Sequence, residues 1–222
     1  MSDIASRIND VRSHLPQGVN LVAVSKFHPA EAVLAAYNAG QRVFGESRAS
    51  EFVTKAAMLP ADIEWHFIGH LQTNKVKSIV GKAALIESVD SRRLLELIDS
   101  VSLAQNIVTD VLMQVHVAAE ETKYGWSPDE LLAYFADKEY SKLQATHLRG
   151  LMAMATNTDD TDRIEKDFAT VGTLHKQILD MAPELKGFDI ISMGMSDDYE
   201  LAIRHGSTSV RIGSYIFGER KL

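Results

Sequence analysis

The clearest signal of the fold of this chain is the stretch Asn20-Leu21-Val22-Ala23-Val24-Ser25-Lys26-Phe27-His28-Pro29. Its apolar run is rich in β-branched residues and predicts a buried strand, and Pro29 opens a helix that ends before Gly40. An open doubly wound sheet usually carries a glycine-rich turn after its first strand. No glycine lies between Ser25 and Pro29, so this turn favours a closed barrel.

The same order of strand and helix recurs along the whole chain. Strands are expected at 20–25, 42–45, 64–69, 85–89, 110–117, 148–154, 189–194 and 209–213. Helices are expected at 4–14, 29–39, 47–57, from 74, 91–105, from 127, 160–181 and 197–205, with a short one after the last strand. Ser127 and Glu130 have the spacing of a capping box. Eight parallel units close into a barrel at about this length. The sequence predicts one α/β domain over residues 1–222, a (β/α)8 TIM barrel with an extra N-terminal helix.

Composition limits the classes of partner and site. The chain has 222 residues, a formal net charge of −7 and a pI near 5.6, which argues against nucleic acid or an anionic membrane as a partner. It has no cysteine, which excludes disulfides, thiolate metal sites and cysteine nucleophiles, and no metal site is expected. No signal pattern follows Met1, and no apolar run reaches transmembrane length. We therefore expect a cytoplasmic protein.

Lys26 is the first candidate functional residue, because an ammonium at the end of a buried strand is costly to desolvate. Taken alone, Lys26 is best explained as a side chain that snorkels into water. The alternative is an amine of lowered pKa at the barrel mouth, which attacks a carbonyl and forms a Schiff base. The residues that the fold places around Lys26 decide between these two interpretations.

Two loops expected at the same end of the barrel have the composition of a phosphate site. In many barrels the loops after the seventh and eighth strands bind phosphate, together with the start of a short extra helix. Here the first of these loops reads Ser192-Met193-Gly194-Met195-Ser196-Asp197-Asp198, and the second begins Gly213-Ser214. Each alone could be a glycine turn with a helix-capping serine. Their occurrence after both expected strands favours phosphate binding.

Arg211 is a charged residue within the eighth strand, two residues before Gly213, so that both face the same side of the sheet. Inside the barrel Arg211 would be a buried cation near the phosphate loops, and outside it would pack between helices. A reactive amine, two phosphate loops and an interior arginine together indicate pyridoxal 5′-phosphate (PLP), with its aldehyde captured by Lys26. These features alone also allow an aldolase-like enzyme with a Schiff-base lysine.

Several motifs of the chain match a known family. They are Ala23-Val24-Ser25-Lys26, Phe44-Gly45-Glu46, Trp65-His66-Phe67-Ile68-Gly69, Leu71-Gln72-Thr73-Asn74-Lys75, Gly150-Leu151-Met152-Ala153, Ser192-Met193-Gly194-Met195-Ser196-Asp197-Asp198 and Val210-Arg211-Ile212-Gly213. From about residue 5 to 220 the chain resembles the pyridoxal-phosphate homeostasis protein family, also called proline synthase co-transcribed. That family belongs to the alanine-racemase-like barrel superfamily. The resemblance implies an alanine racemase N-terminal-domain-like barrel that binds PLP and takes part in intracellular PLP homeostasis.

The resemblance also implies roles for single residues. The cofactor-binding positions that it implies are Lys26 for the Schiff base, Ser196, Gly213 and Ser214 for the phosphate, Arg211 for the pyridine nitrogen, and Met193 and Asn74 in or near the pocket. The chain departs from the family pattern at Ser47, where asparagine is usual, at His70, where proline is common, and at Tyr124, where serine is common. A contact of that asparagine to the ring substituents is therefore not carried over to this chain.

The predicted site lacks groups that make bound PLP a strong catalyst. Enzymes that build carbanions on PLP usually place a carboxylate at the pyridine nitrogen, which keeps this nitrogen protonated and makes the ring an electron sink. An arginine at that position cannot accept the proton, because it is never neutral in proteins. Alanine racemases add a second, β-rich domain with an opposing tyrosine, whereas this sequence ends at Leu222 after the eighth unit. We therefore expect a monomeric PLP carrier with no catalytic residue, whose acceptors could be PLP-dependent apo-enzymes. The alternative is a weak PLP-dependent amino-acid racemase, with His66, His116 and Tyr124 as candidate acid–base groups.

Overall fold

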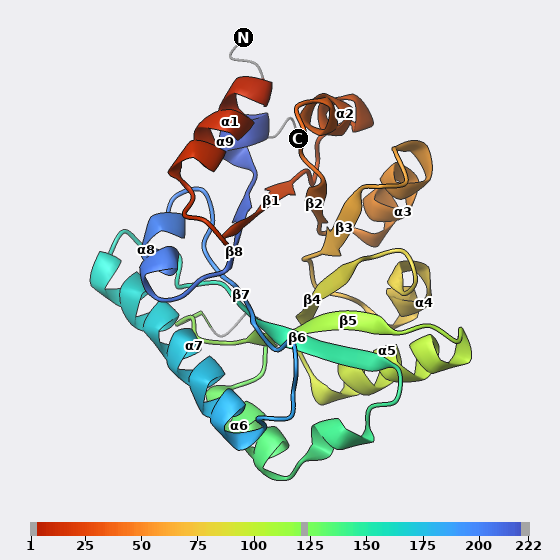
Figure 1. The fold of residues 1–222 in the computed structure, drawn as a ribbon, viewed down its shortest axis with the longest axis vertical. Coiled ribbons are helices and arrows are strands. Elements are labelled where there is room, and N and C mark those ends of the chain that lie inside the picture. The colour runs from red at the N-terminus through yellow and green to blue at the C-terminus, as the bar shows by residue number, and fades with distance from the viewer. Residues whose placement is uncertain (1–3, 121–123, 219–222) are drawn as a thin grey trace.

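The computed structural model describes residues 4–120 and 124–218, and in this part of the chain eight parallel strands form a closed barrel (Figure 1). The strands are β1 (Asn20–Val24), β2 (Val43–Glu46), β3 (Glu64–Phe67), β4 (Leu85–Val89), β5 (Thr109–Val115), β6 (Thr146–Ala153), β7 (Ile190–Ser192) and β8 (Ser209–Ile212). Each strand pairs with the next one in the chain, and β8 pairs with β1 to close the ring. The prediction of a (β/α)8 barrel is confirmed.

Helices cover the outside of the barrel (Figure 1). The α-helices are α1 (Ile4–His14), α2 (Ala30–Asn38), α3 (Ala49–Met58), α4 (Val76–Ile79), α5 (Arg92–Ala104), α6 (Pro128–Ala136), α7 (Thr161–Met181), α8 (Tyr199–Arg204) and α9 (Ser214–Phe217). Two 3-10 helices are η1 (Thr73–Lys75) and η2 (Glu139–Lys142). The extra N-terminal helix α1 packs beside α9, where Arg7 Nη1 donates to the carbonyl of Ile216 at 3.3 Å and the Tyr215 hydroxyl donates to Asp10. Helices α1 and α9 are thereby fastened together beside β1 and β8.

Local sequence signals explain most element boundaries. The expected capping box starts α6: Ser127 Oγ accepts from the Glu130 N–H at 3.2 Å, and Glu130 Oε2 accepts from the Ser127 N–H at 2.8 Å. The seventh strand is shorter than the predicted 189–194, because Gly194 turns the chain with φ of 94°. The 3-10 helix η2 was not expected. None of the described helices combines the length and the apolar composition that a membrane span requires.

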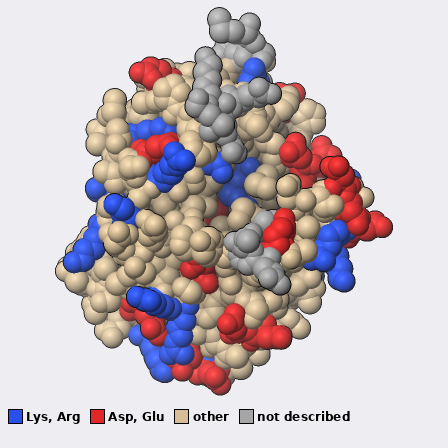
Figure 2. Space-filling model, turned by 180° about the vertical axis from the view of Figure 1, so that it is seen from behind, with Lys and Arg blue, Asp and Glu red and all other residues tan. Residues whose placement is uncertain are grey.

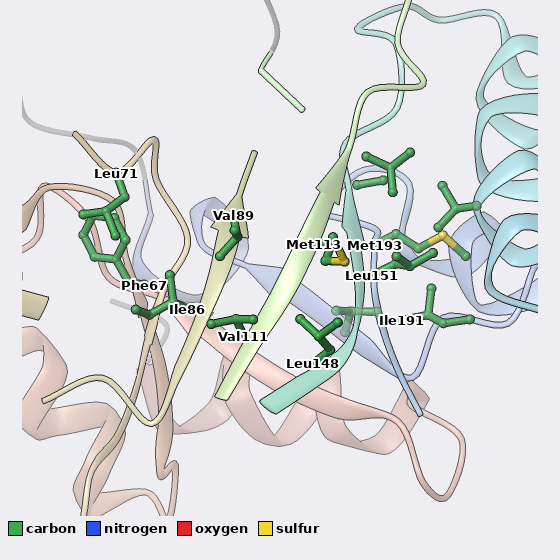
Figure 3. Close-up of a cluster of buried hydrophobic side chains, with 14 of the residues drawn as sticks. Phe67, Leu71, Ile86, Val89, Val111, Met113, Leu148, Leu151, Ile191 and Met193 are labelled. Atoms are coloured by element: carbon green, nitrogen blue, oxygen red, sulfur yellow. The ribbon is translucent and has the colours of Figure 1, made fainter. Parts of the chain in front are cut away.

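The two faces of the strands have different surroundings. Outward side chains such as Phe67, Leu151 and Ile191 join the helices in one large hydrophobic core (Figure 3). Inward side chains at one level of the barrel are apolar, where Leu85 and Leu112 pack together. Other inward side chains are polar and charged, although they are also buried, and these side chains form the floor of the candidate site.

Candidate functional site at the barrel mouth

Arg211 lies inside the barrel, as its contacts with three other strands show. Its Nη1 donates to the carbonyl oxygen of Ser192 at 2.8 Å and to the Ser192 hydroxyl at 2.6 Å, and its Nη2 donates to the Ala153 carbonyl at 2.8 Å. Nη1 also lies 3.7 Å from Glu87 Oε2 on β4. Strands β4 and β8 lie on opposite sides of the ring, so this approach crosses the interior. The alternative of an outward arginine between helices is wrong.

Glu87 is the counter-charge of Arg211 and is completely buried. Its Oε1 lies 2.6 Å from His66 Nδ1, and its Oε2 accepts from the Ser192 hydroxyl at 2.6 Å. Burial alone would raise the pKa of Glu87, but the hydrogen bond and charge of His66, the charge of Arg211 and the Ser192 hydroxyl together lower it. Burial lowers the pKa of Arg211, against the attraction of Glu87. The interior therefore holds an ionised carboxylate beside a guanidinium.

Lys26 is carried by the strand next to Arg211. Val22 is the register partner of Arg211, so its side chain also faces the interior. The ladder continues past the end of β1, because the Ser25 N–H donates to the Gly45 carbonyl at 3.0 Å. Lys26 is half-buried two residues past the end of β1, and continued alternation of side chains from Val22 predicts that it faces the interior. We therefore expect the Lys26 amine to lie in the barrel mouth, past the end of the strand that pairs with the strand of Arg211.

The loops after β7 and β8 meet each other and also β1. The Ser214 hydroxyl donates to the Ser196 hydroxyl at 3.1 Å, which joins the two predicted phosphate loops. A Cβ at Gly213 would lie 3.0 Å from the carbonyl oxygen of Val24 and 3.2 Å from its Cβ. This contact is tight for a Cβ, so glycine favours the close approach of β8 to the strand that precedes Lys26. Asp198 Oδ1 accepts from the Met195 N–H and closes the first loop on itself.

The two remaining predicted residues are Met193 and Asn74. Met193 is completely buried, and its side chain belongs to the hydrophobic core with Leu151 and Ile191 (Figure 3). It follows the inward Ser192 and therefore points outward, toward the helices. Asn74 is exposed on η1, which follows β3, two strands along the ring from β1.

Two departures from the family pattern contact each other at the barrel mouth. The rings of His70, after β3, and Tyr124, after β5, are stacked with centroids 3.8 Å apart and an interplanar angle of 15°. His70 Nδ1 also lies 2.7 Å from Asp90, directly after β4. The third departure, Ser47, packs its backbone against Gly69, where a Cβ would lie 2.1 Å from the Ser47 carbonyl oxygen.

Glu87 was not predicted as part of the site, and Ser192 was predicted only as the first residue of a phosphate loop. A signal for Glu87 was present, because it is the one ionisable residue in the run Leu85-Ile86-Glu87-Ser88-Val89, whose pattern predicts a buried strand. A carboxylate in such a run needs a buried cation, but the sequence does not say which. The hydroxyl of Ser192 gave no such signal.

The middle of the molecule is hollowed when it is seen from behind, and Lys and Arg side chains lie within the hollow (Figure 2). The hollow lies over the centre of the ring of strands in Figure 1. The formal net charge of the whole chain is −7, so basic groups are concentrated here against the overall balance. Such a concave basic surface favours an anionic ligand.

Comparison with known proteins identifies the family. Residues 1–221 match the family model described as alanine racemase, N-terminal domain. The pyridoxal phosphate homeostasis protein of Schizosaccharomyces pombe is 40% identical over 230 residues, which covers 99% of this chain and 94% of that protein. The chain belongs to the pyridoxal phosphate homeostasis protein family.

Further members of the pyridoxal phosphate homeostasis protein family support the assignment. The protein of Aquifex aeolicus is 38% identical and covers 100% of this chain and 97% of its own length. PipY of Synechococcus elongatus PCC7942 without PLP is 39% identical, with a TM-score of 0.92 over 97% of this chain and 100% of PipY. The PipY structure with PLP bound is 38% identical, with a TM-score of 0.88 over the same shares. The resemblance stated from the motifs is confirmed.

The barrel of alanine racemase shares the fold. The alanine racemase of Clostridium difficile 630 matches with a TM-score of 0.76 at 13% identity, covering 100% of this chain and 58% of the racemase. At this identity the match supports the fold alone. The expected likeness to the alanine racemase N-terminal domain is confirmed as a statement about architecture.

Proposed function

We propose that this protein binds PLP in the barrel mouth, with Lys26 as the covalent attachment point, and serves intracellular PLP homeostasis as a monomer. One observation carries the proposal most directly. Gly213 packs against Val24, so the loop predicted for the phosphate lies against the strand that ends in Lys26. An amine for the aldehyde and a cradle for the phosphate are thereby neighbours across the closing pair of strands, β1 and β8. The PLP-bound PipY structure, 38% identical to this chain, supports the same ligand.

The residues of the mouth fit PLP in charge and shape. The phosphate is the anionic end of the molecule, and Ser196 and Ser214 supply two adjacent hydroxyls for it. Gly213 lets this loop lie against Val24, where a Cβ would be 3.0 Å from the carbonyl oxygen. Arg211 supplies a buried cation for the ring nitrogen, which can accept a hydrogen bond when it carries no proton. PLP supplies an aldehyde that forms a Schiff base with an amine.

The chain's own groups explain why binding is favoured over catalysis. Arg211 is held by Ser192, by the Ala153 carbonyl and by Glu87, so it would donate to the ring nitrogen from a fixed position. It has no acceptor atom and would not keep that nitrogen protonated. An unprotonated ring withdraws electrons weakly. Holding PLP and releasing it to acceptors, with PLP-dependent apo-enzymes as the class we propose, needs no stronger withdrawal.

The absorbance spectrum of the purified protein mixed with PLP tests the proposal. We expect a Schiff-base band near the visible edge, and a borohydride-reduced adduct that peptide mass mapping places on Lys26. Lys26→Ala should lose both, while Lys75→Ala, which removes an exposed lysine on η1, should keep both. A band and a trapped adduct that persist in Lys26→Ala would show that the attachment point lies elsewhere.

Weak racemisation of amino acids is a second candidate function, favoured by one observation. His66 is held by the buried Glu87 at 2.6 Å and lies on the strand next to β4, in the orientation of a carboxylate-supported acid–base group. The two functions differ when the PLP-loaded protein is mixed with L- and D-amino acids in deuterated water. Exchange of the α-proton at about 1 s⁻¹ or faster would establish an enzyme, and its absence would leave the carrier function.

A further inference from the structure

The turn that presents Lys26 has a strained backbone. The His28 N–H donates to the Ser25 carbonyl at 3.1 Å, which makes residues 25–28 a four-residue turn with Lys26 second and Phe27 third. Phe27 has φ of 68°, in the left-handed region. A positive φ at the third position is typical of a type II turn, where glycine or asparagine is usual. For a bulky residue this conformation costs about 1–2 kcal/mol, so other contacts must hold it.

Those contacts come from α3, on the outer side of the barrel wall. Glu51 Oε2 accepts from the Phe27 N–H at 2.8 Å. The Arg48 guanidinium lies over the Phe27 ring, 4.3 Å from its centroid, and 3.7 Å from Glu51 Oε1. Lys55 Nζ donates to the Ser25 carbonyl at 2.9 Å and lies 3.5 Å from Glu51 Oε2. The residues on both sides of Lys26 are therefore tied to one helix.

The Lys55 ammonium is itself fixed by a buried partner. Lys55 Nζ donates to Glu46 Oε1 at 2.6 Å, and the same oxygen accepts from the Ser25 hydroxyl at 2.6 Å. The side chains of Lys55 and Glu46 are 7% and 0% exposed, so this ion pair is screened little by water. Ser25 points outward to this pair. Alternation of side chains predicts that Lys26, the next residue, points inward. A charged network on one side of the wall thus sets the backbone of the lysine on the other side.

We propose that Glu51 and Lys55 are positioning residues, which hold the turn 25–28 in the conformation that directs Lys26 into the barrel mouth. This inference rests on the proposed attachment of PLP to Lys26. It assigns to α3 a role in cofactor binding, although α3 packs outside the barrel wall. Without the two side chains, the turn relaxes toward conformations in which the Lys26 amine no longer meets the aldehyde above the phosphate loops.

Glu51→Met tests the first residue, with Asp167→Leu as the matched control. Asp167 resembles Glu51 in three ways: it lies on a helix, pairs with a basic residue four positions away and accepts from a loop N–H after a strand, that of Thr156 at 2.8 Å. We expect the dissociation constant of PLP, read from the Schiff-base absorbance, to rise about tenfold in Glu51→Met, because a hydrogen bond to a charged acceptor is lost. In Asp167→Leu it should stay within about twofold. An unchanged constant in Glu51→Met would overturn the proposal.

A rescue experiment separates positioning from general loss of stability. Glycine adopts a positive φ without strain, so Phe27→Gly should remove the need for Glu51. We expect Phe27→Gly/Glu51→Met to bind PLP more tightly than Glu51→Met and to recover most of the tenfold loss. Chemical denaturation of the same variants shows whether the recovery merely follows the free energy of unfolding, because glycine both relieves strain in the folded turn and loosens the unfolded chain. Failure of the rescue would overturn the role in the turn.

Lys55 is tested in a Glu46→Gln background, so that no buried carboxylate loses its cation. Adding Lys55→Met removes the donor to the Ser25 carbonyl, and we expect the dissociation constant of PLP to rise several-fold relative to Glu46→Gln alone. Equal constants would exclude Lys55 from the positioning network.

Amide hydrogen exchange of the protein without PLP tests the role of Glu51 in the turn separately from PLP binding. The amides of Phe27 and His28 should exchange faster in Glu51→Met than in the wild type, and equally fast in Asp167→Leu and the wild type. If the wild type forms no Lys26 adduct, the proposed function fails, and exchange still decides whether Glu51 holds the turn. Unchanged exchange at both amides would overturn the positioning role.

Discussion

Arg211 and Ser192 are joined inside the barrel by two hydrogen bonds, because one guanidinium nitrogen donates to both the carbonyl and the hydroxyl oxygen of the serine. The Ser192 hydroxyl in turn donates a hydrogen bond to Glu87 Oε2 at 2.6 Å. A cation on β8 and a carboxylate on β4 are therefore linked through a single small side chain on β7. The contribution of this network to the free energy of unfolding can be measured by substituting Glu87.

Glu87→Gln should destabilise the fold by about 3 kcal/mol at neutral pH, because it leaves the buried Arg211 without its counter-charge. Chemical denaturation gives the free energy of unfolding. The control is Glu96→Gln, which breaks an exposed pair with Arg92 and should cost about 0.5 kcal/mol or less. Equal losses in the two variants would show that Glu87 does not balance a buried charge.

Glu87 should also make stability depend on acid pH. Its pKa in the folded chain lies below the ordinary value of 4.5. The unfolded chain therefore binds this proton more readily, and the stabilisation from Glu87 is complete above pH 4.5 and is lost as the pH falls through the folded-state pKa. The difference in unfolding free energy between wild type and Glu87→Gln should shrink in that range. A difference that stays constant from neutral pH to about pH 3 would contradict the ionised carboxylate.

Glu46 should act in the opposite direction. Burial raises its pKa in the folded chain, although hydrogen bonds from Lys55 and Ser25 oppose the shift. The folded chain then keeps this proton to higher pH than the unfolded chain, so the contribution of Glu46 to stability falls as pH rises above 4.5 through the folded-state pKa. Wild type should lose stability relative to Glu46→Gln over that interval. Parallel stability profiles of the two proteins would refute the shift.

Ser214→Ala should weaken the binding of PLP but not of pyridoxal, which lacks the phosphate. The lost hydrogen bond to a charged group predicts a rise of about tenfold in the dissociation constant of PLP. Absorbance titrations with both ligands give the ratio, and the exposed Ser141→Ala serves as the control. A variant that loses affinity for PLP and pyridoxal equally would place Ser214 outside the phosphate cradle.

Gly213→Ala should weaken PLP binding about tenfold, because its Cβ would press on the Val24 carbonyl at 3.0 Å and shift the β8 loop away from β1. Gly18→Ala is the matched control. Gly18 has φ of 90° and open space for a Cβ, so alanine there costs about 1 kcal/mol of stability without touching the mouth. If both variants bind PLP equally well, the close approach of β8 to β1 has no part in binding.

The architecture could be predicted because each strand of the chain ends at a visible change in composition. Lys26, Ser196, Gly213 and Ser214 each lie one to four residues past the end of a strand, so counting eight units was enough to predict that they meet at one end of the barrel. The direction of side chains was harder to predict. Parallel strands are apolar on both faces, so the sequence did not show that Met193 points outward while Ser192 points inward.

Contacts across the ring were beyond a sequence argument. Glu87 and Arg211 are far apart in the chain and lie on strands that do not pair, so neither local pattern names the other. The positive φ of Phe27 was equally hidden, because phenylalanine rarely adopts it and carries no signal for it. The Phe27 N–H donates to Glu51 in α3. The sequence predicted this helix but not its contact with the turn.

The pairing of the first strand with the last has a consequence for the order of synthesis. Lys26 lies just after β1, whereas Arg211 belongs to β8, and Gly213 and Ser214 follow that strand. A chain that leaves the ribosome therefore exposes the amine long before it has the groups that would hold a phosphate. We therefore expect the chain to retain PLP only after β8 has paired with β1, so bound PLP would report that the barrel has closed.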